Sequence, residues 1–261
     1  MKDYIADKIR NIAIIGHGSS GKTSLTSAFL FNSKATTRFT KVERGNTVTD
    51  YDPDEIERNI SINSAVCFLG WNGHKVNIVD CPGYTNFLWD TRASLRAVDS
   101  GAVVICGVAG IEVGTEKVWE MLKEFNLPRI LIINKLDREN SNYKRTVETI
   151  RQVFGRQAVP IQLPIGEEDK FTGVVDLISR KAYIFEKNES GKFKEEEIPS
   201  DLKEEADKKI EELTEMVAEN DEQLMEKYFE KGELSPGSSL RALGKVYSTG
   251  RYFPSLLRLP S

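Results

Sequence analysis

The most informative residues of the chain are eight consecutive positions near its amino terminus. Two glycines are separated there by four residues, and a lysine and a hydroxyl residue follow the second glycine. The eight residues are Gly16, His17, Gly18, Ser19, Ser20, Gly21, Lys22 and Thr23. In such a loop, backbone N–H groups face phosphate oxygens, the lysine reaches the β- and γ-phosphates, and the hydroxyl ligates Mg²⁺. The spacing therefore predicts a nucleoside phosphate site, with Ser24 as a further contact.

The alternative for this segment is an incidental glycine-rich turn. An apolar run at residues 12–15 precedes the loop, and residues 24–30 follow it with the apolar spacing of a helix. A strand, a loop and a helix in that order are what phosphate binding at a helix N-terminus requires. This context favours the phosphate site.

Two later motifs carry chemistry that selects a guanine nucleotide. Asp80-Cys81-Pro82-Gly83 ends one apolar run, so Asp80 can hold Mg²⁺ through water while the Gly83 amide meets the γ-phosphate. Asn134-Lys135-Leu136-Asp137 ends another apolar run. Asp137 can accept hydrogen bonds from two guanine N–H groups that adenine lacks, and the stem of Lys135 can lie across the base. With the first loop, these motifs predict GTP or GDP as the ligand.

Apolar runs rich in β-branched residues lie beside these motifs, and we expect them to form a sheet that is covered on both faces. The runs are residues 12–15, 75–79, 102–106 and 129–133. Helical segments alternate with them at 116–125 and 143–154. The sequence therefore predicts an α/β fold of P-loop NTPase type, with a doubly wound, mostly parallel sheet.

The chain changes character after Gly155. Two prolines, Pro160 and Pro164, punctuate a short strand, residues 171–185 read as two strands, and a polar turn at 187–192 precedes an amphipathic helix at 201–220. We expect three parts. They are a GTP-binding core at 1–155, an inserted α+β subdomain at 156–235, and an anomalous carboxyl-terminal tail at 236–261.

The composition is ordinary for a soluble globular protein, with 39% hydrophobic and 29% charged residues. No apolar run approaches the roughly 20 residues that a membrane span needs, and residues 1–10 lack the apolar stretch of a secretory signal. Cys67, Cys81 and Cys106 lie in or beside apolar runs and have no metal-ligand spacing. We expect reduced, structural thiols in a cytosolic protein that has no membrane partner.

The net charge of −4 is unevenly distributed along the chain. Residues 186–233 hold 18 acidic and 8 basic side chains, whereas residues 234–261 hold 4 basic side chains and no acidic one. The acidic segment is either a solvated helical face or an electrostatic docking surface.

With these motifs in place, residues from about Ile9 to Leu234 resemble the amino-terminal GTPase domain of translational GTPases of the elongation factor G family. Residues 54–62 match the family's switch segment, in which Ser61 takes the place of the Mg²⁺-binding threonine. Residues 161–166 and 173–177 resemble the start of the inserted subdomain, which contacts the ribosomal stalk protein in that family.

The resemblance implies a GTPase of protein synthesis that works on the ribosome in the cytoplasm and uses GTP, GDP and Mg²⁺. It implies Thr23, Ser61 and Asp80 at the metal, and Lys22, Gly83 and Tyr84 as the catalytic residues. The implied partners are the factor-binding region of the large ribosomal subunit and, through residues 156–235, its stalk protein. Direct, sequence-specific binding to nucleic acid is not expected.

Four residues depart from the family's pattern and together resemble its divergent second type. Tyr84 stands where the family has a histidine that orients the attacking water, and a neutral phenol cannot act as an imidazolium, so we predict slow hydrolysis. Ser19 replaces an aspartate. Gly18 replaces a bulky residue, so a hydrophobic gate with Ile60 is expected to be open on one side. Asn59 replaces a glycine and tolerates a positive φ.

Three functions remain open at this point. The chain is a ribosome-associated GTPase present as its nucleotide domain, a GTP-dependent binding switch whose nucleotide state is the output, or a non-functional truncated product.

The tail lacks a strand that ends in Ser-Ala, whose backbone amide meets the guanine carbonyl in the family. No acidic residue follows Glu233. A shifted reading frame is one interpretation, because permitted codons for residues 250–260, read one base earlier, can encode the missing strand and motif. A genuine divergent carboxyl terminus is the other.

Overall fold

The computed structural model describes residues 4–155, 158–186, 190–218 and 253–257. The chain forms two compact units, an amino-terminal unit that extends to Lys135 and a carboxyl-terminal unit that begins at Leu136.

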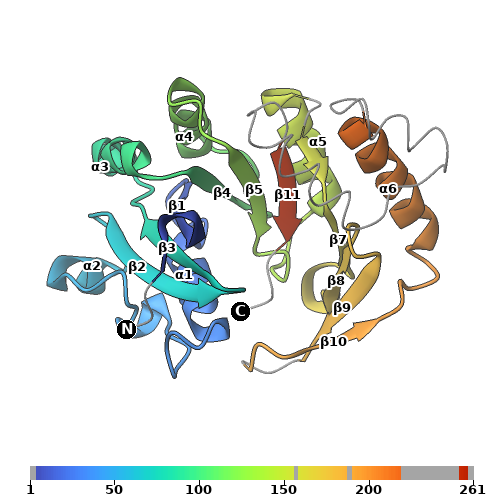
Figure 1. The fold of residues 1–261 in the computed structure, drawn as a ribbon, viewed down its shortest axis with the longest axis horizontal. Coiled ribbons are helices and arrows are strands. Elements are labelled where there is room, and N and C mark those ends of the chain that lie inside the picture. Colours follow the sequence, from blue (N-terminus) through green and yellow to red (C-terminus); the bar gives the residue numbers. More distant parts are fainter. Residues whose placement is uncertain (1–3, 156–157, 187–189, 219–252, 258–261) are drawn as a thin grey trace. The chain divides into compact units, whose positions relative to one another are not determined.

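The amino-terminal unit is built on strands in the order β2-β3-β1-β4-β5 (Figure 1). Neighbouring strands are parallel except for β2, which runs antiparallel to β3. The strands are β1 (Ile9–Gly16), β2 (Ala65–Trp71), β3 (His74–Asp80), β4 (Ser100–Cys106) and β5 (Arg129–Asn134). The predicted α/β fold with a mostly parallel sheet is therefore confirmed.

Four α-helices join these strands. They are α1 (Lys22–Asn32), α2 (Pro53–Arg58), α3 (Leu88–Ser94) and α4 (Val113–Glu124), with short 3₁₀ turns at Ala6–Lys8, Val42–Arg44, Thr85–Phe87 and Leu95–Ala97. Helix α1 packs against β1 and β3, and α4 packs against β4 and β1. Each strand–helix connection places a loop at the carboxyl end of a parallel strand, where ligands of open α/β sheets bind.

The core of this unit consists of the apolar runs that the sequence indicates. The fully buried side chains Ile15, Val103, Ile105 and Ile133 come from β1, β4 and β5. Continuous β-branched runs form strands here because both faces of a parallel sheet are covered, and the runs of β4 and β5 are almost entirely buried. Cys67, Cys81 and Cys106 are buried free thiols, and burial raises the pKa values of Cys67 and Cys81 to about 12.

The carboxyl-terminal unit contains a second, antiparallel sheet in the order β10-β9-β8-β7. Its elements are α5 (Tyr143–Phe154), β6 (Ala158–Pro160), β7 (Gln162–Ile165), a 3₁₀ turn at Glu168–Lys170, β8 (Gly173–Asp176), β9 (Lys181–Phe185), β10 (Phe193–Glu196), α6 (Lys203–Ala218) and β11 (Phe253–Leu257). Strand β11 pairs in parallel with β6.

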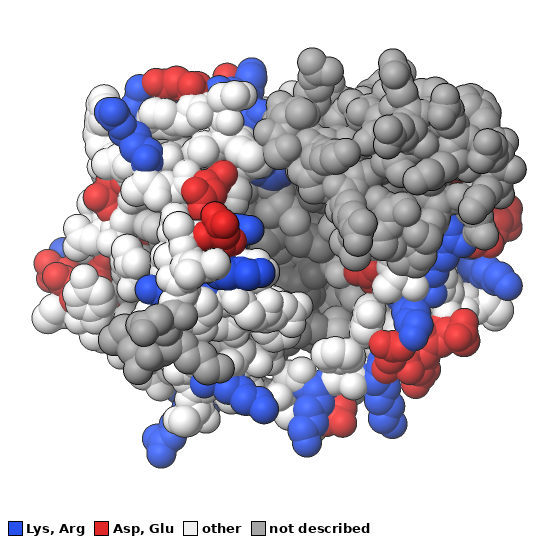
Figure 2. Space-filling model, viewed as in Figure 1, with Lys and Arg blue, Asp and Glu red and all other residues white. Residues whose placement is uncertain are grey.

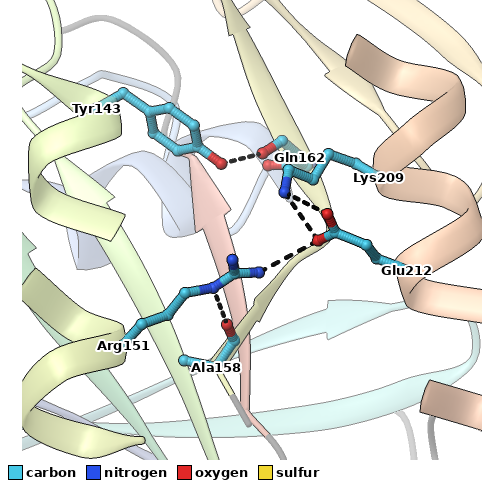
Figure 3. Close-up of polar contacts among 6 residues, drawn as sticks. All are labelled: Tyr143, Arg151, Ala158, Gln162, Lys209 and Glu212. Atoms are coloured by element: carbon cyan, nitrogen blue, oxygen red, sulfur yellow. Dashed lines mark hydrogen bonds and ion pairs between the residues drawn. The ribbon is translucent and has the colours of Figure 1, made fainter. Parts of the chain in front are cut away.

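Polar contacts tie α5, the strands and α6 together within this unit (Figure 3). Arg151 of α5 donates to the carbonyl of Ala158 at 3.2 Å and forms an ion pair with Glu212 of α6 at 3.4 Å. Glu212 also accepts from Lys209 at 2.8 Å, and Tyr143 donates to the carbonyl of Gln162 at 3.1 Å. The Glu212 carboxylate therefore pairs with a lysine of its own helix and with an arginine of α5, which links the two helices.

Local signals account for the bounds of α5. The side chain of Asn142 accepts from the backbone N–H of Arg145 at 2.8 Å and so caps the first turn. The helix ends at Gly155, whose φ of 102° is a conformation that favours glycine. The predicted helix at 143–154 is confirmed residue for residue.

Other elements of this unit differ from the sequence analysis. The short strand expected around the two prolines is two strands, β6 and β7, and β10 was not expected because its four residues are all exposed. The predicted helix at 201–220 is observed as α6, and positions 219–220 lie outside the described residues, as do 187–189 of the polar turn. Of the tail, 253–257 form β11, although the Ser-Ala motif is missing; 236–252 and 258–261 lie outside the described residues.

Figure 2 shows that acidic and basic side chains alternate over the described surface on the face drawn, without a large continuous patch of one sign. Within the described part of the chain, no helix is both long and apolar enough to cross a membrane.

Candidate nucleotide-binding site

The phosphate loop connects β1 to α1, as the sequence predicts, and its lysine is turned inward. The side chain of Lys22 is only 6% exposed, and its Nζ donates to the carbonyl oxygen of His17 at 2.7 Å. Burial lowers the pKa of Lys22 to about 8, with attraction from Asp80 opposing the shift. The loop therefore wraps around a partly desolvated cation.

The loop is held from β5 by the asparagine and lysine of the second motif. Asn134 is buried, and its side-chain amide donates to the carbonyl of Ser20 at 2.8 Å. Lys135 Nζ donates to the carbonyl of Ser19 at 2.7 Å. Gly21 has a φ of 95°, and a Cβ there would lie 2.2 Å from the Asn134 amide nitrogen, so only glycine fits this contact.

The motif that follows β3 approaches the loop just as closely. A Cβ on Gly83 would lie 2.2 Å from Lys22 Nζ and 2.7 Å from the carbonyl oxygens of Gly16 and His17. The missing side chain at Gly83 therefore lets its backbone lie against the lysine that serves the phosphates. The structure thus brings Gly83 and Lys22, both predicted site residues, together beside the Gly16 and His17 carbonyls.

Hydroxyl and carboxylate groups cluster at the start of α1. Thr23 Oγ1 lies 3.1 Å from Ser61 Oγ, and Ser61 donates to Asp50 Oδ1 at 2.8 Å. Thr49 donates to Asp80 Oδ2 at 2.7 Å. The other Asp80 oxygen, Oδ1, is buried and accepts no hydrogen bond from the described residues. A buried oxygen without a hydrogen-bond partner, on a carboxylate that interacts with the Thr23 side chain, fits a hard divalent cation such as Mg²⁺.

The charges of this cluster are costly without a ligand. Burial raises the pKa of Asp80 to about 6, and the Thr49 hydrogen bond and Lys22 oppose that shift. Burial also raises the pKa of Asp50, while the hydrogen bond from Ser61 opposes it. Both carboxyls are destabilised as anions because water is excluded, so a bound cation would relieve the cost.

A buried glutamate of α2 positions Ser61. Glu55 Oε1 accepts from the backbone N–H groups of Ile62 at 2.8 Å and Asn63 at 3.0 Å, and Oε2 accepts from that of Asp52 at 3.2 Å. Helix α2 ends at Asn59, whose φ of 53° confirms the expected tolerance for this conformation. The segment that carries Ser61 is therefore fixed by one carboxylate.

His17 links the phosphate loop to α4. Its Nδ1 accepts from the backbone N–H of Gly114 at 3.2 Å, so Nε2 carries the proton and points to Glu112 Oε1 at 3.3 Å. A Cβ on Gly114 would lie 2.6 Å from Nδ1. His17 therefore has a structural role, because it connects the phosphate loop to the start of α4.

Two predicted residues have settings that the sequence did not indicate. Asp137 lies in the carboxyl-terminal unit. Tyr84 lies against the phosphate loop, with its ring over Gly18, so the space that was expected to be open beside Gly18 is filled. Ser24 follows Thr23 in α1 and is half-buried.

Three residues of the site were missed by the sequence analysis, namely Thr49, Asp50 and Glu55. A signal for Glu55 was present, because Asp52-Pro53-Asp54-Glu55 is a helix start with a capping box and proline at the first position. Nothing in the sequence spacing marks Thr49 or Asp50, whose partners are 31 and 11 residues away.

Comparison with known proteins places this chain in a family. The family model described as the elongation factor Tu GTP binding domain matches residues 7–248. Elongation factor G of Granulibacter bethesdensis is 39% identical over 251 residues, which is 96% of this chain and 36% of that protein. Elongation factor G of Gluconobacter oxydans is 40% identical over 248 residues, 95% of this chain and 35% of that protein.

A solved structure is also similar. The crystal structure of a protein from Thermus thermophilus superposes with a TM-score of 0.89 at 35% identity, covering 96% of this chain and 37% of that one. The chain thus spans about a third of the length of the curated relatives it matches.

Replacing Asp80 by Asn tests the cost of its buried charge. The unfolded carboxyl has its ordinary pKa of 3.8 and the folded one a pKa of about 6, so the free energy of unfolding falls as pH rises through that window. At pH 8 we expect Asp80→Asn to stabilise the nucleotide-free protein by about 1–2 kcal/mol, less than the full shift implies because Lys22 loses the attraction of the Asp80 carboxylate. Below pH about 4 the gain should vanish.

Urea denaturation across pH measures this effect, and Asp54→Asn at an exposed position of α2 is the control. A destabilised Asp80→Asn protein at pH 8 would show that the anion is paired in the folded state and contradict the prediction.

Replacing Glu55 by Gln tests its hold on the Ser61 segment. An amide nitrogen would face a backbone N–H group, so we expect a loss of about 2 kcal/mol in the free energy of unfolding. Hydrogen exchange at Ile62 and Asn63 should accelerate, whereas the exposed neighbour substitution Glu57→Gln leaves both unchanged. Unaltered exchange in Glu55→Gln would refute the positioning role.

Proposed function

The chain belongs to the family of elongation factor Tu GTP-binding domains, as a G domain of elongation factor G type, and we propose that it binds GTP and hydrolyses it on the ribosome during protein synthesis. Guanine nucleotide binding follows from the family. We further propose that Mg²⁺ assists hydrolysis and that the chain is of the family's divergent second type.

The observation that carries the proposal is the convergence of two separate segments on the phosphate loop. Lys22 lies against Gly83, and Asn134 holds Ser20 from β5. Each contact comes from the carboxyl end of a different parallel strand, which is where an α/β sheet binds its ligand. Phosphate contacts are assigned to residues 16–24, to Asp80 and to Gly83.

Base selection is assigned to Asn134, Lys135 and Asp137. A carboxylate at 137 accepts from the two guanine N–H groups, and a base without them leaves that carboxylate unpaired. Lys135, already anchored on Ser19, lies at the side of the loop where its stem covers the base plane.

Metal binding is assigned to Thr23, Ser61 and Asp80. The two hydroxyls are 3.1 Å apart, and the free Asp80 Oδ1 supports the same position. When bound, Mg²⁺ supplies neutralisation of phosphate charge. Thr49 and Asp50 orient these metal-binding residues. Thr49 donates to Asp80 Oδ2, and Asp50 accepts from the Ser61 hydroxyl.

Catalysis is assigned to Lys22, Gly83 and Tyr84. The Lys22 ammonium stabilises charge that develops on the phosphates, and the Gly83 amide donates to the γ-phosphate. Tyr84 occupies the position from which a side chain orients the attacking water, but its hydroxyl is engaged with Ser19 at 3.2 Å. That contact favours a second candidate function, a GTP-dependent binding switch with little turnover.

Residues 156–235 are proposed as the inserted subdomain that contacts the ribosomal stalk. In its described part, the exposed acidic side chains Glu204, Asp207, Glu211 and Glu215 share one face of α6. Two other acids, Glu205 and Glu212, pair with Lys144 and Arg151 of α5 instead. The outward acids support an electrostatic contact, and we place the protein in the cytoplasm, where the ribosome is.

Replacing Asp137 by Asn tests guanine recognition. The amide cannot accept from both guanine N–H groups, so GTP affinity should fall on the order of 100-fold. Xanthosine triphosphate should bind better than GTP, because its C2 carbonyl accepts from the new amide. Isothermal titration measures both affinities.

Asp169→Asn at an exposed position of the same unit is the matched control. Unchanged GTP affinity in Asp137→Asn would remove Asp137 from the site.

Replacing Tyr84 by His tests the predicted slow hydrolysis. An imidazole can orient and exchange protons with water at neutral pH, so ribosome-stimulated single-turnover hydrolysis should rise on the order of 100-fold. Tyr51→His, at an exposed tyrosine, should leave the rate unchanged. Equal rates for Tyr84→His and the parent would contradict the assignment of Tyr84.

A further inference from the structure

Tyr84 occupies space that a side chain at position 18 would need. A Cβ built on Gly18 would lie 3.0 Å from two carbons of the Tyr84 ring and 3.2 Å from a third. These separations are shorter than ordinary van der Waals contact. Gly18 therefore provides a seat for the ring, although its own backbone does not have the positive φ that favours glycine.

The Tyr84 hydroxyl is anchored by the next residue of the loop. Tyr84 OH and Ser19 Oγ are 3.2 Å apart, with either as donor. Ser19 has a φ of 60°, and its carbonyl accepts from Lys135 Nζ at 2.7 Å. The Tyr84 hydroxyl therefore contacts a residue whose backbone carbonyl is held by Lys135, one of the residues assigned to the guanine base.

Tyr84 also begins the segment that leads to α3. It precedes the 3₁₀ turn Thr85–Phe87, and its carbonyl accepts from the backbone N–H of Phe87 at 2.9 Å. The residue before it, Gly83, lies against Lys22. A contact at Tyr84 therefore joins the phosphate loop to the start of α3.

We propose that Gly18 and Ser19 are positioning residues for Tyr84, forming with it a latch that holds its hydroxyl at Ser19 and keeps it from the water beside the γ-phosphate. The proposal rests on the proposed GTPase function. The latch opens when the loop after Gly83 moves and the ring leaves Gly18. Hydrolysis is then limited by release of Tyr84, and the nature of residue 19 sets that limit.

A double-mutant cycle tests the anchor. Ser19→Ala retains the Cβ and removes only the partner of the Tyr84 hydroxyl, so single-turnover hydrolysis at saturating GTP should rise about three- to tenfold, the range of one hydrogen bond. With Phe at 84 there is no hydroxyl to release, so Tyr84→Phe and Ser19→Ala/Tyr84→Phe should have equal rates. The same factor in both backgrounds would overturn the proposal.

A variant of the seat tests the ring contact. Gly18→Ala places a methyl group 3.0 Å from the ring, so Tyr84 is displaced and the rate should rise as in Ser19→Ala. Gly70→Ala, in β2, is the matched control. Its Cβ would lie similarly close to a tyrosine, at 3.2 Å from the Tyr4 hydroxyl. A rise in rate confined to Gly18→Ala supports the latch, whereas an unchanged or lower rate in Gly18→Ala, or an equal rise in both variants, would overturn it.

A spectroscopic readout separates the latch from the proposed function. In nucleotide-free protein, the aromatic ring shifts the amide resonances of Gly18 and Ser19, and Tyr84→Leu should move both. Trp89→Leu, which removes a 79% exposed aromatic side chain from α3, should move neither. If no variant hydrolyses GTP but Tyr84→Leu moves these resonances, the GTPase proposal fails and the contact stands. If hydrolysis is observed and the resonances stay, the latch is wrong.

Discussion

The burial of Lys22 beside Asp80 is the interaction on which the rest of the site depends. Both side chains are less than 7% exposed, and burial shifts the pKa of each toward its neutral form. Lys22 donates to the His17 carbonyl rather than to Asp80, so the two buried charges attract each other only at longer range. Buried charges of this kind repay their desolvation cost only when further polar partners complete their hydrogen bonding. Here His17 and Thr49 supply part of that completion, and the unpaired Asp80 Oδ1 leaves the remainder to a ligand. Burial therefore leaves both charges incompletely compensated, a cost that the phosphate and the cation proposed above would relieve.

Close backbone packing gives this charged pair its fixed surroundings. The loop is approached from β5 at Gly21, from the segment after β3 at Gly83, and from α4 at His17, and each contact excludes a Cβ at a glycine. Because the three approaches come from different elements, the loop cannot shift without disturbing strand ends in the core. The rigid sheet therefore fixes the position of a loop that has no secondary structure of its own.

The sequence predicts the parts of this structure that depend on local patterns. The phosphate loop, the motif ends of β3 and β5, and helix α5 follow from residue spacing and apolar periodicity, and they are where they were expected. The contacts that escaped prediction are tertiary. Exposed β10 has no apolar pattern to reveal it, and the partner of Thr49 lies 31 residues away. No periodicity encodes that distance, because it is set by how the strands align.

The same distinction explains why three unusual residues have to be considered as one contact. Considered singly against the family's pattern, Gly18 removes a bulky side chain and Ser19 removes a carboxylate. Tyr84 replaces a histidine with a weaker acid–base group. In the fold, the ring fills the volume that Gly18 leaves, and its hydroxyl takes the partner that Ser19 provides. Substituting one of them changes the setting of the other two, so their effects on a shared contact are not additive. The chemistry of position 84 is therefore determined by its fit to the phosphate loop as well as by its side chain.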